Sequence, residues 1–356
     1  MSLTVNRAGL GARRGDGPAG WLFTLPVIVV LGLFMLVPVL MALWVSFSDW
    51  TGRGSPLAPG TGFVGFENYA AITSGGGLAE RNFGIAMRNN AWYALLVVPL
   101  QTGLSLGLAL LVNRAVLRGR GFFRTAFYFP SVTSSVAITV LWLFLFSTSG
   151  AVNQVLSWIG VNGPNWFNEP AGIVHVALGN PEGPAFLTGS DFLGVSWWDW
   201  LSGPSVAMSA LILMAVFTTS GTFMLLFLAA LQNIGPELDE AGRMDGASAW
   251  QRFWRITLPQ LRPALFTVLT LGLIGCWQVF DQIYTGTQGG PGKTTVTPAY
   301  LSYEAAFTDQ AWGQGAAISF VLFAVIVVFT LFQRWVLRER DASKRVEKRI
   351  AKGAKA

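Results

Sequence analysis

The residue types that could do chemistry concentrate in one polar stretch, residues 240–259, between two long apolar runs. The stretch begins with a carboxylate, Glu240, and ends with the helix-stopping pair Leu258-Pro259. Upstream, the order Gly-Pro-Glu at 235–237 is typical of a helix start, because proline suits the first turn and an acidic side chain suits the positive end of the helix dipole. The stretch is too polar to lie in a membrane, so we expect a short helix in water.

Two glycines four residues apart indicate what such a helix could do. A helix from residue 235 to about 249 would place Gly242, Gly246 and Ala249 on one face, which would be almost bare of side chains. The backbone of another protein could approach that face closely, and Glu240 beside it could pair with a basic residue of that protein. The pattern therefore predicts docking to a separate polypeptide. The competing interpretation is an ordinary amphipathic loop.

The sequence contains few residues that are suited to catalysis or to metal binding. Cys276 is the only cysteine and His175 the only histidine, which leaves no disulfide framework, no cysteine-based zinc cluster and little material for acid–base catalysis. Residues 286–294, GTQGGPGKT, look like a phosphate-binding loop, but five residues instead of four separate Gly286 from the pair Gly292-Lys293. We therefore expect no enzymatic activity, no metal and no cofactor on this chain. We interpret the histidine as an ordinary loop residue and the glycine-rich segment as a flexible loop.

The elements that surround this stretch are apolar enough to be embedded in a bilayer. Hydrophobic residues make up 52% of the 356 residues and charged residues only 12%. Soluble domains usually have roughly 25% charged residues, so the composition indicates a membrane protein. The fold class we predict is all-α and polytopic, without a second soluble domain.

Six apolar runs approach or exceed the roughly 20 residues that a transmembrane helix needs. The first is too long for the apolar core of a signal peptide, which covers about 7–15 residues. We predict transmembrane helices within one domain, residues 21–337, at residues 21–47, 91–112, 125–146, 204–231, 263–284 and 313–337. The other segments are an N-terminal tail, a tryptophan-rich insert, a central loop and a basic tail, at residues 1–20, 147–203, 232–262 and 338–356.

The basic residues are distributed unevenly between alternate connections. All but four of the 24 Lys and Arg residues lie in the two tails, counting Arg334 at the end of the sixth span with the C-terminal tail, in the central loop or in the connection between the second and third spans. The positive-inside rule places these segments in the cytoplasm and the tryptophan-rich insert outside. The same distribution accounts for the net charge of +6 and argues against a nucleic-acid surface. The four remaining cations are Arg53, Arg81, Arg88 and Lys293.

A few polar residues fall within or beside the predicted spans. Asp281 is the only carboxylate among them, and a charge at the bilayer centre costs roughly 2.5–3.5 kcal/mol on insertion scales, so Asp281 should face water or a partner. The hydroxyl groups of the fourth span could bond a neighbouring helix. Alternatively, the polar groups of the fourth and fifth spans line a path for a polar solute. The candidate path residues are Thr218, Thr219, Thr222, Gly275, Cys276, Trp277, Gln278 and Asp281.

The central loop carries a family pattern. Its order E-A-x-x-x-x-G-A, followed after eight residues by I-x-L-P, resembles the cytoplasmic signature loop of ABC importer permeases. The matching residues are Glu240, Ala241, Gly246, Ala247, Ile256, Leu258 and Pro259. Asp245 lies in a Met-Asp-Gly-Ala run that is similar to the carbohydrate branch, and Gly242 stands where that family usually has alanine. Weaker matches, including Gly289-Gly290-Pro291, extend the resemblance over about residues 20–337 to the first permease of the maltose and glycerol-phosphate type.

This resemblance implies a type I ABC importer permease fold in a bacterial inner membrane. The chain would be a non-catalytic subunit of a binding-protein-dependent sugar importer, with a second homologous permease and a dimer of cytoplasmic ATPase subunits that bind ATP and Mg. The central loop would be a coupling helix seated on the ATPase, through Glu240, Ala241, Gly242, Asp245, Gly246, Ala247, Ile256, Leu258 and Pro259. An extracytoplasmic sugar-binding protein would contact Gly289, Gly290 and Pro291.

The alternative from another class is an ion-coupled secondary transporter. Such carriers commonly hold acidic, His or Lys residues inside the membrane for protons, and these spans offer only Asp281 at an edge. The sequence does not identify the sugar. It does disfavour a phosphate-bearing solute, because no Lys or Arg projects into the spans.

Overall fold

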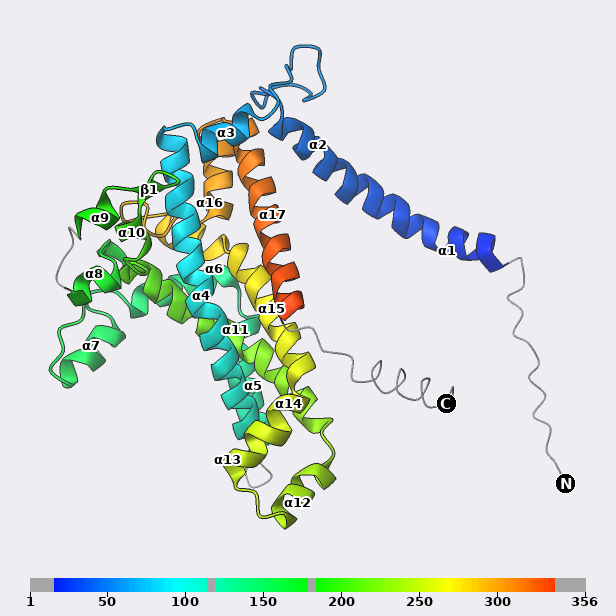
Figure 1. The fold of residues 1–356 in the computed structure, drawn as a ribbon, viewed down its shortest axis with the longest axis vertical. Coiled ribbons are helices and arrows are strands. Elements are labelled where there is room, and N and C mark those ends of the chain that lie inside the picture. Colours follow the sequence, from blue (N-terminus) through cyan, green and yellow to red (C-terminus); the bar gives the residue numbers. More distant parts are fainter. Residues whose placement is uncertain (1–15, 114–118, 179–183, 337–356) are drawn as a thin grey trace, which may run out of the picture.

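The structure is a computed structural model that describes residues 16–113, 119–178 and 184–336. The basic C-terminal tail and most of the N-terminal tail therefore lie outside the described residues. Helices dominate the described chain, and the sheet recorded in it is one hairpin, β1 (Asp191–Phe192) with β2 (Val195–Ser196). Figure 1 shows an elongated helical body with one long helix that projects from it.

Four helices are long and apolar enough to cross a membrane, and the number rises to six if each of two bent helix pairs is one span. The first of the four is a continuous helical run that includes a π-helical turn: α1 (Asp16–Leu31), η1 (Gly32–Leu36) and α2 (Val37–Ser46). The other three are α4 (Leu78–Asn113), α11 (Val206–Gln232) and α17 (Trp312–Val336). The second span is thus part of a helix that begins 13 residues before the expected residue 91.

The third expected span, residues 125–146, is two helices, α5 (Arg120–Val132) and α6 (Ser135–Leu145), bent by 99°. Thr133 lies between them with an extended backbone, φ −76° and ψ 146°. Pro130 removes one N–H from the last turn of α5 and so weakens its continuation. The break directs the two halves to different neighbours and opens a corner beside α11.

The fifth expected span, residues 263–284, is also interrupted. It begins after a 68° bend that separates the residues of the central loop from α15 (Arg262–Trp277). α15 ends at Trp277, seven residues earlier than expected, and Thr297 Oγ1 donates to the backbone oxygen of Val279 at 2.9 Å just beyond it. That bond ties the chain just beyond the helix end to the start of the next helix, α16 (Pro298–Tyr303).

The connection expected as a loop at 285–312 is partly helical. It contains α16 (Pro298–Tyr303), flanked by the π-helical turns η4 (Ile283–Thr287) and η5 (Glu304–Thr308). α16 forms because Thr297 caps it, accepting from the backbone N–H of Tyr300 at 3.4 Å, and because proline occupies its first position.

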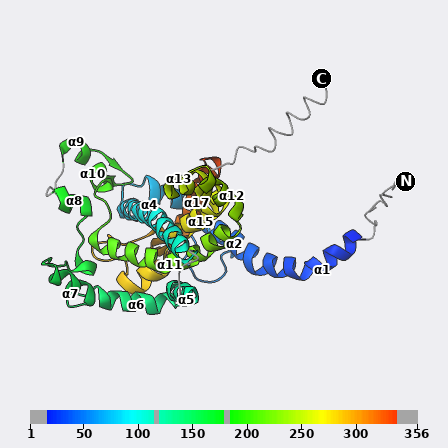
Figure 2. The same ribbon diagram turned by 90° about the horizontal axis from the view of Figure 1, so that it is seen from below.

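The core lies where α4, α11 and α15 pack together. One buried cluster is centred on Met208, Leu211 and Trp277, and a second is centred on Phe227 and Leu228. The first span does not share this core, because the most apolar 18-residue window of Gly20–Ser46 has no buried residue. Both ribbon views show α1 and α2 leading away from the body (Figures 1 and 2).

The tryptophan-rich insert is folded against one side of the bundle. Trp166 Nε1 donates to Asn153 Oδ1 at 2.8 Å, and the hairpin packs on α4. His175 lies in a helix, not in a loop as we expected, and its ring stacks on Trp198 with the centroids 4.9 Å apart. The short helices of the insert are α7 (Ala151–Trp158), η2 (Trp166–Asn168), α8 (Ile173–Leu178), α9 (Ala185–Thr188) and α10 (Trp197–Trp200). A further short helix, α3 (Glu67–Thr73), covers the end of the bundle near α17.

Candidate functional site

The central loop forms two short helices at the end of the body opposite α3 (Figure 1). The first, α12 (Pro236–Met244), is shorter than expected, because the chain turns into the left-handed region at Gly246 with φ +73°. Ala249 belongs to the next helix, so the prediction that Gly242, Gly246 and Ala249 share one helical face is wrong. No atom lies within 4 Å of the position a side chain would take on Gly246. Glycine is therefore favoured there by backbone conformation rather than by space.

The second helical segment comprises α13 (Ala249–Arg252), the π-helical turn η3 (Phe253–Thr257) and α14 (Leu258–Gln260). Gly242 is buried against it. A Cβ atom on Gly242 would lie 2.9 Å from Ile256 Cδ1 and 3.2 Å from Arg252 Cδ. The bare surface at Gly242 therefore serves packing within this chain and is not left open for a partner.

An ion pair that we did not predict ties the two helical segments together. Arg252 Nε donates to Asp239 Oδ1 at 2.7 Å, and Arg252 Nη1 donates to the backbone oxygen of Ala247 at 2.9 Å. Arg243 adds a second bond to the same carboxylate at 2.8 Å. Burial alone would raise the pKa of Asp239, but the hydrogen bonds from Arg252 and Arg243 outweigh it and lower the pKa below its ordinary value. The carboxylate therefore stays charged and holds the loop in one shape.

A capping box fixes the start of α13. Ser248 Oγ accepts from the backbone N–H of Gln251 at 3.3 Å, and the backbone N–H of Ser248 donates to Gln251 Oε1 at 2.8 Å. The helix so oriented carries Trp250 and Trp254, which pack edge to face with their centroids 5.4 Å apart and remain exposed. These rings lie just before the bend that leads into the apolar α15, a place that suits tryptophan at a membrane interface.

The predicted coupling residues divide into an exposed set and a supporting set. Glu240, Ala241 and Asp245 are exposed on and just after α12, and no ion pair is recorded for Glu240 within the described chain. Gly246 is also exposed. The supporting residues are buried or half-buried behind them: Gly242, Ala247, Ile256, Leu258 and Pro259. The exposed set is the part of the loop that a second protein could touch.

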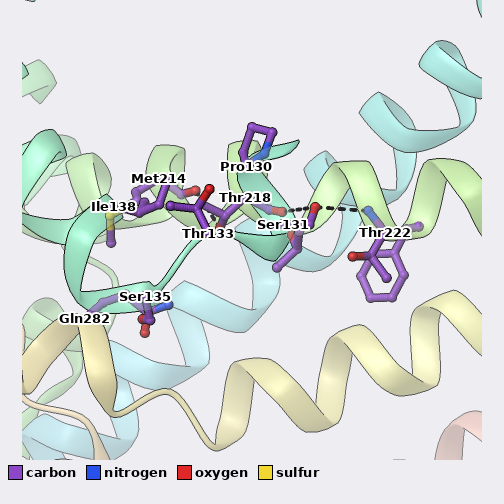
Figure 3. A pocket seen from close by; sticks show the side chains of 11 residues that line it. Pro130, Ser131, Thr133, Ser135, Ile138, Met214, Thr218, Thr222 and Gln282 are labelled. Carbon is purple, nitrogen blue, oxygen red and sulfur yellow. Dashed lines mark hydrogen bonds between the residues drawn. The ribbon is translucent and has the colours of Figure 1, made fainter. Parts of the chain in front are cut away.

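A polar hollow of about 290 Å³ lies at the broken third span (Figure 3). Ser131 bridges α5 to α11 there, since its hydroxyl donates to the backbone oxygen of Thr218 at 2.6 Å and accepts from the backbone N–H of Thr222 at 3.2 Å. Thr133, from the bend itself, and Gln282 also line the hollow. The bend thus brings hydroxyl groups of α5 next to the predicted path residues of α11.

A second hollow of about 330 Å³ lies beside the first, between α4, α11 and α15, and shares Thr219 with it. Five of the predicted path residues line this second hollow: Thr219, Gly275, Cys276, Gln278 and Asp281. Trp277 does not join them. Its ring lies on the other side of α15 and stacks on Phe329 with the centroids 5.4 Å apart.

Gln101 is a site residue that we did not predict, because it stands alone in an apolar helix. Its side chain is only 1% exposed and lines the second hollow. Its Oε1 accepts from Thr219 Oγ1 at 2.7 Å, whereas its Nε2 has no hydrogen-bond partner in the described chain. The sequence feature that could have identified Gln101 is an amide side chain inside a predicted span, since a polar group at that depth is costly and usually functional.

The electrostatics of the two hollows are simple. Their polar lining consists of hydroxyl and amide groups, and Asp281 is the one charged residue among the residues that line them. Such a lining can exchange hydrogen bonds with a solute rich in hydroxyl groups, and it offers no cation to balance an anionic one.

The glycine-rich segment at 289–291 is held in place, contrary to the flexible loop that we expected. Thr295 Oγ1 donates to the backbone oxygen of Gly290 at 2.6 Å. Asn89 Nδ2 donates to the backbone oxygens of Lys293 and Val296 at 2.9 and 3.0 Å, which anchors the segment to α4. Gly289 itself is buried, so Gly290 and Pro291, which are half-buried, are the members of the segment within reach of another molecule.

Long apolar helices, polar hollows between them and a folded polar loop at one end define a membrane-embedded permease subunit. The family described as "Binding-protein-dependent transport system inner membrane component" matches residues 101–341. The chain belongs to this family, whose members are permeases of ABC importers. The comparisons give no support to the alternative of an ion-coupled secondary transporter.

Curated relatives match almost the whole chain. The lactose transport system permease protein LacF of Rhizobium radiobacter is 32% identical over 90% of this chain and 94% of that protein. The trehalose/maltose transport system permease protein MalF of Thermococcus litoralis is 30% identical over 89% of this chain and 92% of that protein. A crystal structure of a bacterial ABC transporter that imports the acidic polysaccharide alginate superposes with a TM-score of 0.69 at 22% identity, covering 92% of this chain and 98% of that one. That likeness confirms the type I importer fold.

Proposed function

We propose that this chain is the permease subunit of a sugar importer and forms half of the path for an uncharged saccharide. The observation that carries this proposal is the lining of the two hollows, which is rich in hydroxyl and amide groups and contains no Lys or Arg. The lactose and trehalose/maltose permeases named above support the substrate class. The alginate importer differs in carrying an acidic polysaccharide, and a lining without cations argues against such a substrate here.

Thr219 and Gln101 are the groups through which we expect the solute to be recognised. The hydroxyl of Thr219 lies between the two hollows, and neither of the two N–H donors of the Gln101 amide has a partner in the described chain. Gln278 and Asp281 stand exposed at the other side of the second hollow. A sugar hydroxyl can donate to the carboxylate and accept from the amides, so the lining suits the donors and acceptors of a saccharide.

The central loop would transmit movement from a cytoplasmic ATPase dimer to this subunit. The exposed set, with Glu240 at its centre, would sit in a groove of the ATPase, and the Asp239–Arg252 pair would keep the loop rigid enough to transfer force. ATP and Mg would be bound by that partner, and this chain would bind no cofactor and hydrolyse nothing. Closure of the ATPase dimer would then drive a rigid-body change from an inward-facing to an outward-facing permease.

The distribution of basic residues supports an orientation with both termini and α12 in the cytoplasm. An extracytoplasmic binding protein would then deliver sugar on the side of Gly290 and Pro291. The exposed first span supports a second permease subunit, because its most apolar window has no buried residue in this chain and leaves that surface free for a neighbour.

Charge reversal at the loop tests the coupling. Glu240→Lys should abolish sugar uptake and weaken co-purification with the ATPase, while the amount of protein in the membrane stays at the wild-type level. Glu67→Lys, which reverses an exposed carboxylate on α3 at the opposite end of the body, is the matched control and should transport normally. Wild-type uptake by the Glu240 variant would overturn the coupling role.

A further inference from the structure

A third hollow of about 700 Å³ lies on the side of α4 and α15 that faces away from the sugar path. Its lining is almost entirely apolar and includes Trp92, Leu95 and Pro99 of α4, Leu273 of α15 and Phe329 of α17. Trp200 of the insert closes one end of this groove, and Trp92 Nε1 donates to the backbone oxygen of Trp200 at 2.8 Å. The proposed transport function uses none of these residues.

A cation lies on α4 one turn beyond the residues of that helix that line the groove. Arg88 precedes Trp92, Leu95 and Pro99 by four, seven and eleven residues, so it lies on the same face of α4, one turn farther out. It lies within electrostatic range of Asp199 in α10. Two of its five N–H donors are recorded in hydrogen bonds, and both bonds go to one oxygen, Asn89 Oδ1, at 3.3 and 2.8 Å.

We propose that this groove binds a phospholipid, with one acyl chain along α4 and α15 and the phosphate group at Arg88. The chemistry at each end matches the corresponding part of the lipid, because an aliphatic and aromatic trough suits an acyl chain and a guanidinium suits a phosphate. Tryptophan rings at the closed end suit the level of the headgroups.

The dimensions favour a lipid over a helix from another subunit. The lined part of α4 runs from Ala91 to Pro99, which is about 12 Å at the rise of an α-helix. That length is close to the thickness of one leaflet, about 15 Å, whereas a transmembrane helix crosses both. α10 lies beside the half of α4 that is farther from α12 (Figures 1 and 2), and Trp197 and Trp200 of α10 line the groove, so the insert occupies part of the surface that a crossing helix would need. With the orientation proposed above, the lipid belongs to the outer leaflet.

Lipid retention by the assembled importer tests the inference. The complex would be purified from nanodiscs of phosphatidylglycerol and phosphatidylethanolamine, and phospholipid bound per complex would be measured by native mass spectrometry. Wild type should retain one phospholipid that Ala91→Phe, which obstructs one end of the groove, loses. Arg88→Gln should bind it about tenfold more weakly, which corresponds to about 1.4 kcal/mol. Arg53→Gln, at an exposed arginine outside the groove, is the matched control and should behave as wild type.

Because the experiment measures bound lipid and not transport, failure of the lipid proposal is distinguishable from failure of the proposed transport function. Equal retention by wild type, Ala91→Phe and Arg88→Gln would overturn the proposal, as would the absence of bound phospholipid from wild type. A Leu95→Cys variant identifies a different occupant, since the one native cysteine is buried. Cross-linking of that cysteine to a second permease would show that a protein helix fills the groove and would also overturn the proposal.

Discussion

Replacing Gly246 separates a conformational role from a steric one. The residue has φ +73°, and no atom lies within 4 Å of the position of a Cβ. An L-residue pays roughly 1–2 kcal/mol for the left-handed conformation, and Asn adopts it more readily than Ala. Gly→Ala also lowers the entropy of the open loop, which offsets only part of that cost at a position with positive φ. Gly246→Ala should therefore disfavour the native turn by about 1.4 kcal/mol, or tenfold, whereas the larger Gly246→Asn should cost much less.

The assay has two parts. Hydrogen exchange of the α12 and α13 amides in the purified complex would measure opening of the turn, and sugar-stimulated ATPase activity would measure coupling. We expect faster exchange and weaker coupling in Gly246→Ala and near wild-type behaviour in Gly246→Asn. The opposite order, with Asn worse than Ala, would refute this reasoning and show that the ATPase packs tightly on the space above Gly246.

Two further predictions follow from the loop and the path. Acidification should loosen the α12–α13 connection, because the lowered pKa of Asp239 gives a stabilisation that is present above the ordinary Asp pKa and lost as pH falls through the lower folded value. Limited proteolysis near Met244 should accelerate over that range in wild type, and a flat response would contradict the pairing. Gln101→Leu should raise the KM for sugar severalfold while thermal stability holds or rises, because an unpartnered buried donor is lost. A fall in stability with unchanged KM would show that the amide is only structural.

Periodicity and composition predicted the long helices and the position of the polar loop, because those depend on local chemistry. Breaks in the spans were harder to predict. The bend after Val132 depends on Ser131 bonding to the backbone of α11, which is a contact between residues 87 and 91 positions apart. Pro130 indicated where the third span could break, but it did not predict the angle between α5 and α6, since proline is common in transmembrane helices that continue through it.

The central loop also contains a contact that the sequence alone could not predict. The pair Asp239 and Arg243 follows the helical i, i+4 rule and was visible in the sequence, whereas Arg252 comes thirteen residues after the carboxylate across a turn. The sequence suggested one shared role for Gly242 and Gly246, whereas in the structure their roles differ. Gly242 leaves room for Ile256, and Gly246 supplies a backbone angle that side-chain patterns do not reveal.

The long first helix that stands clear of the body makes the subunit incomplete by itself. Its most apolar window buries no residue against this polypeptide, and only its end at Val45 and Ser46 packs on the body, so its angle and depth depend on its neighbours in the membrane. The core around α4, α11 and α15 does not use this helix. A copy without a companion would therefore expose the whole apolar window to lipid, whereas a companion subunit would cover part of it.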